Sequence, residues 1–229
     1  MRKSLNASER GAYFFLVLPA VLLYGAVMAF PTVFSIGISL SDYSGGRLFG
    51  GNIPIRFVGL KHYFRMFCDP YFWLALKNNI YIMLISVFGQ IPLGFIFAYT
   101  LHRKLVGMRD FFQTIIYLPA VISHIVIGII WQVILLSPYG VFTELMQKFK
   151  PGWENTNLVL GKGVMFPILF AILWMFTGSY LLIFLANLQK IDPQLIEAAK
   201  IDGATEWQIM TRVILPALSG VIVTTAILA

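Results

Sequence analysis

A short polar stretch near the end of the sequence carries the residues best suited to chemistry. The stretch "EAAKIDGATEWQIMTRVILPA" runs from Glu197 to Ala217 and is interrupted by a single glycine, Gly203. With the residues just before it, the stretch holds four carboxylates in a chain that is otherwise poor in charge: Asp192, Glu197, Asp202 and Glu206. Carboxylates can cap helices or pair with a partner surface. We therefore look to this loop for contact chemistry.

Catalytic chemistry finds little support elsewhere in the sequence. The three histidines, His62, His102 and His124, fall at different expected depths of a membrane, and no His-x-x-x-His, Ser/Lys or intramembrane carboxylate pair occurs. There is no phosphate-binding loop, so ATP hydrolysis would belong to a partner. One cysteine, Cys68, excludes an internal disulfide and a cysteine metal cluster. We expect no catalytic residue, metal site or cofactor in this chain.

The composition is that of an integral membrane protein. The 229 residues are 59% hydrophobic and 12% charged, and soluble domains carry about twice that charged fraction. The net charge of +7 suits cationic loops at an anionic membrane surface. Because no basic run or basic stripe occurs, nucleic acid is excluded as a partner.

Apolar segments long enough to cross a membrane recur along the chain. A helical span needs about 20 apolar residues. Prolines inside these segments favour a helical bundle, in which neighbouring helices satisfy the freed carbonyls. We predict an all-α polytopic bundle forming one domain, residues 1–229, with a sixth span missing after the five visible ones. These are Tyr13–Leu40 (a retained signal anchor), Asn78–Leu101, Phe111–Leu136, Gly163–Leu188 and Val213–Ala229.

The basic residues favour a cytoplasmic N-terminus. The hairpin "HRKLVGMRD" packs three of them into nine positions, whereas the opposite loops spread theirs widely. The polar loop at 189–212 is then cytoplasmic. On the other side, "FVGLKHYFRMFCDPYFW" predicts an amphipathic helix, either at the outer interface or as a lid over the bundle, through apolar residues at helical spacing: Leu60, Tyr63, Phe64 and Phe67.

The polar loop predicts two short helices around a glycine corner. Asp192 can cap a first helix that begins with Pro193, and Gly203 ends it because glycine adopts positive φ freely. Thr205 restarts a second helix, with Gln208 as its capping-box partner. Leu195, Ala198 and Ala199 share one face of the first helix, whereas Glu197 and Lys200 lie off it. A helix this short needs a surface to pack on, either lipid headgroups or a soluble partner.

The spacing of this loop resembles a known motif. Glu197-Ala198-Ala199, Asp202-Gly203-Ala204 and Ile214-Leu215-Pro216 are similar to the EAA loop of bacterial ABC importer permeases. The segments "FVGLKHY", "DPYFWLALKNN", "YLPAVIS" and "IFLANLQKIDPQLIEAAKIDGA" look like the sugar permease subfamily, of maltose and glycerol-phosphate type. The resemblance covers nearly the whole chain.

The resemblance implies a set of partners in the bacterial inner membrane. A second, homologous but different permease subunit would complete the pathway, and two ATPase subunits would bind ATP and Mg. An extracytoplasmic binding protein would deliver the sugar. The loop would sit in a cleft on the ATPase, with Glu197 as polar contact, Ala198 and Ala199 allowing close approach, and Asp202-Gly203 forming the corner.

The resemblance also implies a substrate pathway. His124 and Ala120 match pocket-lining positions, and a histidine within a span is costly unless it faces a cavity or a partner. A hydrogen bond to a neighbouring helix is the alternative for His124, and simple packing is the alternative for the aromatic side chains. The second lining segment holds Trp174, Met175, Phe176 and Thr177, and a third lies at or beyond Ala229.

Three alternatives stay open on the sequence alone. The transported substrate could be a glycerol-phosphate derivative rather than a sugar. An integral membrane enzyme would need catalytic groups that the sequence does not display. A structural membrane scaffold would not need the helix–glycine–helix loop.

Overall fold

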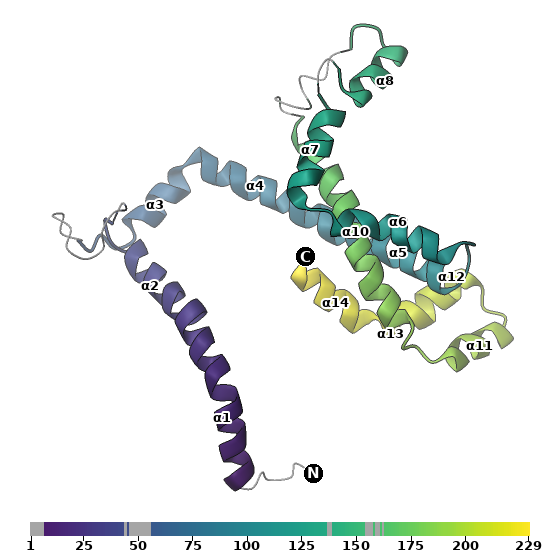
Figure 1. Cartoon of the computed structure of the whole chain (residues 1–229), viewed down its shortest axis with the longest axis horizontal. Coiled ribbons are helices and arrows are strands. Elements are labelled where there is room, and N and C mark those ends of the chain that lie inside the picture. Colours follow the sequence, from purple (N-terminus) through teal and green to yellow (C-terminus); the bar gives the residue numbers. More distant parts are fainter. Residues whose placement is uncertain are drawn as a thin grey trace. The chain divides into compact units, whose positions relative to one another are not determined.

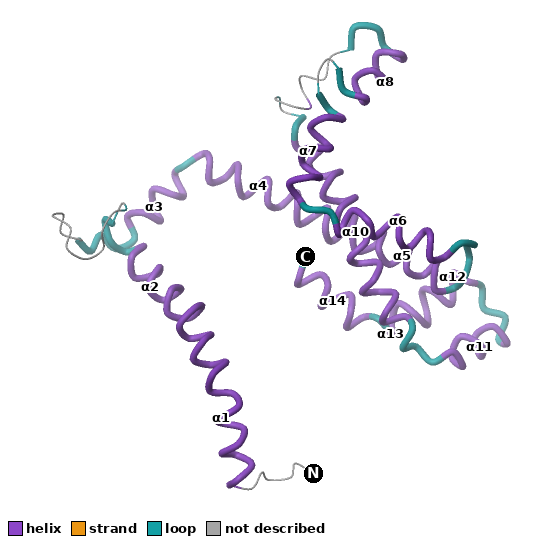
Figure 2. Tube along the Cα trace, viewed as in Figure 1, coloured by secondary structure: helices purple, strands orange, loops and turns teal. Residues whose placement is uncertain are grey.

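The structure is a computed structural model that describes residues 7–43, 45, 56–136, 139–153, 158, 161 and 163–229, with backbone only for 7–12. All regular elements in these ranges are helices, as Figure 2 shows, which confirms the all-α prediction. The chain divides into two compact units, Met1–Leu74 and Ala75–Ala229, and each is described by itself. The single permease domain over residues 1–229 stays a prediction.

The first unit begins with a long apolar helical segment. It joins α1 (Ala7–Tyr24), the π-helical turn η1 (Gly25–Ala29) and α2 (Phe30–Ser39). Its apolar part, Tyr13–Ser39, has 27 residues and is long enough to cross a membrane. The predicted span is therefore confirmed to within one residue. None of the hydropathy window within this segment is buried by the first unit.

Polar contacts attach the short helix α3 (Lys61–Cys68) to the end of α2. The Ser39 Oγ and Tyr63 hydroxyl oxygens lie 2.7 Å apart, and His62 Nε2 lies 2.9 Å from the Ser41 carbonyl oxygen. The predicted amphipathic helix is thus present. Most of its predicted apolar face is exposed: Leu60, Phe64 and Phe67.

The second unit is organised around one long helix. Helix α10 packs against α5 and α6, as can be followed in Figure 1. The helices of this unit are α4 (Pro70–Ile85, whose first residues belong to the first unit), η2 (Ser86–Gln90), α5 (Ile91–His102), α6 (Arg109–Val121), α7 (His124–Ile134), α8 (Val141–Phe149), α10 (Met165–Leu188), α11 (Pro193–Ile201), α12 (Glu206–Gln208), η3 (Ile209–Ile214), α13 (Leu215–Ala217) and α14 (Ser219–Leu228).

Two glycines allow α10 to approach its neighbours closely. A β-carbon placed on Gly94 of α5 would lie 2.6 Å from Tyr180 Cβ. One placed on Gly178 of α10 would lie 2.5 Å from the Ile116 carbonyl oxygen of α6. Small residues of this kind are typical of helix contacts in membranes, where packing and polar contacts replace the hydrophobic effect. The crossing therefore depends on the absence of side chains at two positions.

Each π-helical turn precedes a proline by two residues. Pro31, Pro92 and Pro216 follow η1, η2 and η3 in this way. Proline cannot donate to the carbonyl four residues earlier, and its ring crowds that carbonyl. The preceding turn widens in response, which is a recognised way for membrane helices to keep their backbone groups satisfied. These three prolines therefore account for the positions of the π-helical turns.

The predicted spans are present, but two of them are bent. Pro70–His102 is one 33-residue span that begins eight residues before the predicted Asn78, and Met165–Leu188 confirms the fourth span. The predicted span Phe111–Leu136 is broken between α6 and α7 with a bend of 98°. Helices α12 to α14 contain the fifth span and bend by 67° after Ala217. The described residues therefore provide three straight candidate spans, or five if each bent pair counts as one.

One buried core connects the ends of several helices in the second unit. Phe95 of α5 meets Phe184 of α10 edge to face, with ring centroids 5.6 Å apart. Gln90 is only 2% exposed and donates its side-chain amide to the Ile172 carbonyl oxygen at 3.0 Å. The core continues into the polar loop through Ile196 and Ile209. The loop is thus packed onto the helical bundle.

Candidate functional site

The first half of the polar loop folds as the sequence predicts. Asp192 caps α11, because its Oδ1 accepts a hydrogen bond from the Gln194 backbone N–H at 3.0 Å. Pro193 occupies the first helical position, where its missing N–H costs nothing. The helix ends at Ile201 with Asp202 as its C-cap, and the next residue, Gly203, has a φ of +77°. This left-handed conformation is the reason for glycine at the corner.

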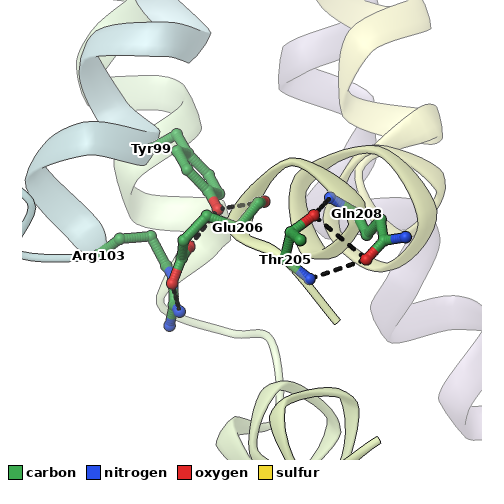
Figure 3. Close-up of polar contacts among 5 residues, drawn as sticks. All are labelled: Tyr99, Arg103, Thr205, Glu206 and Gln208. Carbon is green, nitrogen blue, oxygen red and sulfur yellow. Dashed lines mark hydrogen bonds and ion pairs between the residues drawn. The ribbon is translucent and has the colours of Figure 1, made fainter. Parts of the chain in front are cut away.

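The second half begins with the predicted capping box. The Gln208 backbone N–H donates to Thr205 Oγ1 at 3.3 Å, and the Thr205 N–H donates to Gln208 Oε1 at 2.8 Å. Figure 3 shows this reciprocal pair at the start of α12. Two of the amide groups that a helix start leaves free are therefore satisfied locally. Together with the cap on α11, this gives the loop two defined helical arms.

The faces of α11 differ in part from the expectation. Ile196 is 7% exposed and packs on the core, and Ala199 is half-buried against the same core. Leu195, Glu197 and Ala198 are exposed. Ala199, predicted to share a face with Leu195 and Ala198, therefore lies at the inner edge of that face beside Ile196.

Two of the predicted coupling residues, Asp202 and Glu197, lie at the corner and beside a small cavity. Asp202 is exposed and ends α11. A cavity of about 220 Å³ lies between α11 and the end of α5, and Glu197, Lys200 and His102 are among its lining residues. Two exposed charges of the loop, Glu197 and Lys200, thus border a recess that the loop shares with α5.

A cluster that the sequence did not predict joins this loop to α5. Arg103 holds the Glu206 carboxylate with two hydrogen bonds, from Nη2 to Oε1 at 2.6 Å and from Nε to Oε2 at 3.1 Å. The Tyr99 hydroxyl donates to Glu206 Oε2 at 2.7 Å and also lies 3.1 Å from the Glu206 carbonyl oxygen. Figure 3 shows the three side chains converging.

The charges of this cluster stabilise one another. The hydrogen bond with Glu206 raises the pKa of the Arg103 guanidinium above its ordinary value, which keeps Arg103 charged. Glu206 also stands in the first turn of α12, where a carboxylate suits the positive end of the helix dipole. The sequence showed both charged residues, but nothing local links positions 103 residues apart.

A second candidate site lies between α7 and α10. A cavity of about 440 Å³ is enclosed mainly by apolar side chains of these helices, and three polar side chains also line it: His124, Trp131 and Gln132. Ligand cavities in proteins combine apolar walls with a few polar groups in this way. The bend between α6 and α7 brings α7 to this position.

Trp131 lines this cavity and packs against two aromatic rings that line the neighbouring cavity. Trp131 contacts Phe170 and Trp174 edge to face, with ring centroids 5.5 and 6.2 Å away. Its indole Nε1 is buried and has no hydrogen-bond partner among the residues that the structure describes. A buried donor without a partner is costly, so an acceptor from a ligand would be favourable here. Trp131 was not among the predicted pathway residues, although it lies seven residues after His124 and therefore on the same face of a helix.

The structure separates the predicted pathway residues into different surroundings. His124 and Met175 line the larger cavity, and the His124 and Phe176 rings lie 5.8 Å apart. Trp174 and Thr177 line a neighbouring cavity of about 280 Å³ against α5 and α6. Ala120 is half-buried in α6 and lines neither cavity.

The position of His124 differs from the expectation of a histidine in the middle of a span. His124 is the first residue of α7, directly after the break at Ile122 and Ser123. A polar ring is easier to place at such a break, because the backbone there already departs from regular helix. Within the described ranges no group of three or more metal-ligating side chains gathers.

Long apolar helices joined by polar loops define a multi-pass helical membrane protein. Residues 90–229 match the family described as the binding-protein-dependent transport system inner membrane component. The chain belongs to this family and is a transport subunit rather than an enzyme. Membership implies a partner ATPase and a substrate-binding protein.

Individual relatives agree with the family. A probable ABC transporter permease protein of Pyrococcus horikoshii is 34% identical over 209 residues, covering 89% of this chain and 68% of that protein. The polygalacturonan/rhamnogalacturonan transport system permease protein of Bacillus subtilis is 31% identical, and the match covers 94% of this chain and 66% of that protein. The trehalose transport system permease protein of Mycobacterium tuberculosis is 29% identical, and the match covers 97% of this chain and 69% of that protein. The chain spans about two thirds of the length of these relatives.

A solved structure has the same fold. One chain of a bacterial alginate ABC transporter, crystallised with an alginate pentasaccharide-bound periplasmic protein, superposes with a TM-score of 0.76. The match covers 93% of this chain and 69% of that chain at 22% sequence identity. The similarity shows that the fold described above is that of an ABC transporter subunit.

Proposed function

We propose that this chain is a permease subunit of an ATP-driven importer for a carbohydrate delivered by an extracytoplasmic binding protein. We infer a carbohydrate substrate because several relatives are named as transporters of trehalose, lactose or polygalacturonan. A second, homologous permease subunit completes the pathway, and two ATPase subunits bind ATP and Mg. The chain lies in the bacterial cytoplasmic membrane with its N-terminus and its polar loop in the cytoplasm.

The polar loop is the coupling element in this proposal. Glu197 and Ala198 are exposed on α11, so they form the contact with the ATPase. Asp202 and Gly203 set the corner, and Ala199 supports the helix from inside. An ATPase that binds the loop differently in two states can shift the transporter between two conformations.

The cavity between α7 and α10 is the proposed sugar-binding region. The Trp131 ring suits the apolar face of a sugar ring, and its unpaired Nε1 suits a sugar hydroxyl. Trp174 packs against Trp131 from the neighbouring cavity. His124 and Gln132 add polar groups and Met175 supplies apolar surface, while Phe176 lies beside the His124 ring. This arrangement supports a carbohydrate, which presents both apolar faces and hydroxyl groups.

ATP-dependent uptake by the assembled transporter tests the proposal. Proteoliposomes holding the co-purified complex and its binding protein are supplied with labelled trehalose, lactose, an oligogalacturonate and glycerol 3-phosphate. We expect uptake of a carbohydrate. Trp131→Phe, which keeps the ring but removes the donor, is expected to raise the KM for uptake about fivefold, the equivalent of a hydrogen bond of about 1 kcal/mol.

The matched control is Trp73→Phe in the first unit, which is expected to leave the KM unchanged. Uptake of glycerol 3-phosphate alone would contradict the carbohydrate class. An unchanged KM in Trp131→Phe, with normal assembly, would contradict the placement of the sugar between α7 and α10.

A further inference from the structure

The cluster of Tyr99, Arg103 and Glu206 connects two elements that have different roles in the proposed transport cycle. Tyr99 and Arg103 are four residues apart, one helical turn, at the end of α5. Glu206 begins α12, which follows the corner at Gly203. The cluster therefore bridges the second arm of the polar loop and a membrane-spanning helix.

The geometry of the cluster restricts orientation more than a simple ion pair does. Arg103 grips both carboxylate oxygens of Glu206, and the Tyr99 hydroxyl reaches both the side chain and the backbone of the same residue. Two-point guanidinium contacts fix the relative direction of their partners. Because Glu206 is 45% exposed on its side chain, the ion pair itself adds little stability. Its main effect is to orient α12 on α5.

The inner end of the cluster is rigidly packed. The Tyr99 side chain is 5% exposed, and its ring lies 6.1 Å from that of Phe95 between centroids. Phe95 in turn packs on Phe184 of α10. Contacts thus run from α12 through a buried tyrosine to α5 and α10, and α10 lines the cavity between α7 and α10.

The Gly203 corner separates α11 from α12. Gly203 has a φ of +77°, and the chain turns there between the two arms of the loop. The cluster lies beyond this corner, so it attaches the second arm to α5 independently of α11.

We propose that Tyr99, Arg103 and Glu206 form a latch that makes α12 and α5 move as one body during the transport cycle. The three are positioning residues: through them, displacement of the coupling loop by the ATPase reaches the helices around the substrate cavity. The proposal rests on the coupling role proposed above. It adds the path by which the motion enters the membrane helices.

Spin labels across the latch test the one-body motion without any substrate. Cysteines replace Leu105 and Trp207, both exposed, in a Cys68→Ser background, and the complete complex is placed in lipid nanodiscs with and without ATP plus vanadate. Electron paramagnetic resonance is expected to give one narrow distribution of distances between the labels at positions 105 and 207, both with and without ATP plus vanadate. Arg103→Met and Glu206→Gln are expected to broaden it, and the charge swap Arg103→Glu with Glu206→Arg is expected to narrow it again in part.

Transport provides the second readout. With the carbohydrate taken up in the proteoliposome assay, uptake per ATP hydrolysed is expected to fall about fivefold or more in Arg103→Met and Glu206→Gln, the lower range of an allosteric coupling. In both variants the ATPase is expected to stay bound to the complex. Lys104→Asn is the control, because it removes an exposed positive charge next to Arg103. Lys104 has a positive φ, which asparagine tolerates. Arg103→Lys, which keeps the charge but loses the two-point contact, is expected to be intermediate.

The proposal would be overturned if Arg103→Met and Glu206→Gln both kept a narrow distance distribution between the labels and a wild-type ratio of uptake to ATP hydrolysis. Loss of the bound ATPase or of thermal stability in proportion to lost uptake would also overturn it, because that outcome shows a purely structural role. Failure of the function proposed above gives different results. In that case wild type takes up none of the carbohydrates, or charge reversal at Glu197 leaves the ATPase bound, while the label distances still report on the latch.

Discussion

Glu197→Lys is expected to release the partner ATPase from the complex. Glu197 is exposed on the nine-residue helix α11, which is packed on the bundle by Ile196 on another face. Reversing a charge at a protein interface places like charges together and costs several kcal/mol. We therefore expect at least about a tenfold loss of co-purified ATPase, together with loss of ATP-driven uptake. Affinity purification through a tag on this chain measures the ratio of the subunits.

The matched control is Glu144→Lys, which reverses an exposed carboxylate on another nine-residue helix, α8. It is expected to keep the ATPase bound. The thermal stability of both variants should match the wild type, because neither side chain is buried. An ATPase retained in full by Glu197→Lys would show that α11 is not the docking helix.

Gly178→Ala is expected to damage the bundle itself. The new β-carbon would lie 2.5 Å from the Ile116 carbonyl oxygen and 2.7 Å from Tyr117 Cα. Both neighbours are backbone atoms, so α6 and α10 must separate. Forcing an extra carbon into a packed contact costs about 1 to 3 kcal/mol. We expect a lower melting temperature in detergent and less assembled complex, measured by fluorescence-detected size-exclusion chromatography.

Gly220→Ala provides the control for the same chemical change. A β-carbon on Gly220 of α14 meets no atom within 4 Å, and alanine favours helix over glycine by about 1 kcal/mol. This variant should be as stable as wild type or more so. If Gly178→Ala behaved like Gly220→Ala, the close crossing of α6 and α10 would be wrong.

Local signals in the sequence predicted the elements of the loop well. The cap at Asp192, the corner at Gly203 and the capping box at Thr205 each depend on residues within three positions of one another. Long apolar runs likewise predicted the spans, since length and hydropathy alone decide whether a helix can cross a membrane. These features need no knowledge of the tertiary structure.

Features that depend on tertiary contacts were not predictable. The break after Ile122 leaves no clear mark beyond Pro119 three residues earlier, and it moves His124 from mid-span to a helix start. Ala199 turns inward because Ile196 finds a buried site on the bundle. The pairing of Arg103 with Glu206 joins residues that are distant in sequence. In each case the deciding partner lies in another helix.

The central claim of this account is that α11 delivers the ATPase-driven motion to this chain. The most direct test is a photo-activated cross-linking residue, p-benzoylphenylalanine, at Leu195, which is 55% exposed on α11. The same residue at Tyr139, exposed just before α8, is the control. We predict that illumination of the active complex joins Leu195 to the ATPase and that Tyr139 gives no such product. An ATP-hydrolysing complex without the Leu195 product, or with the ATPase joined only to Tyr139, would contradict the account.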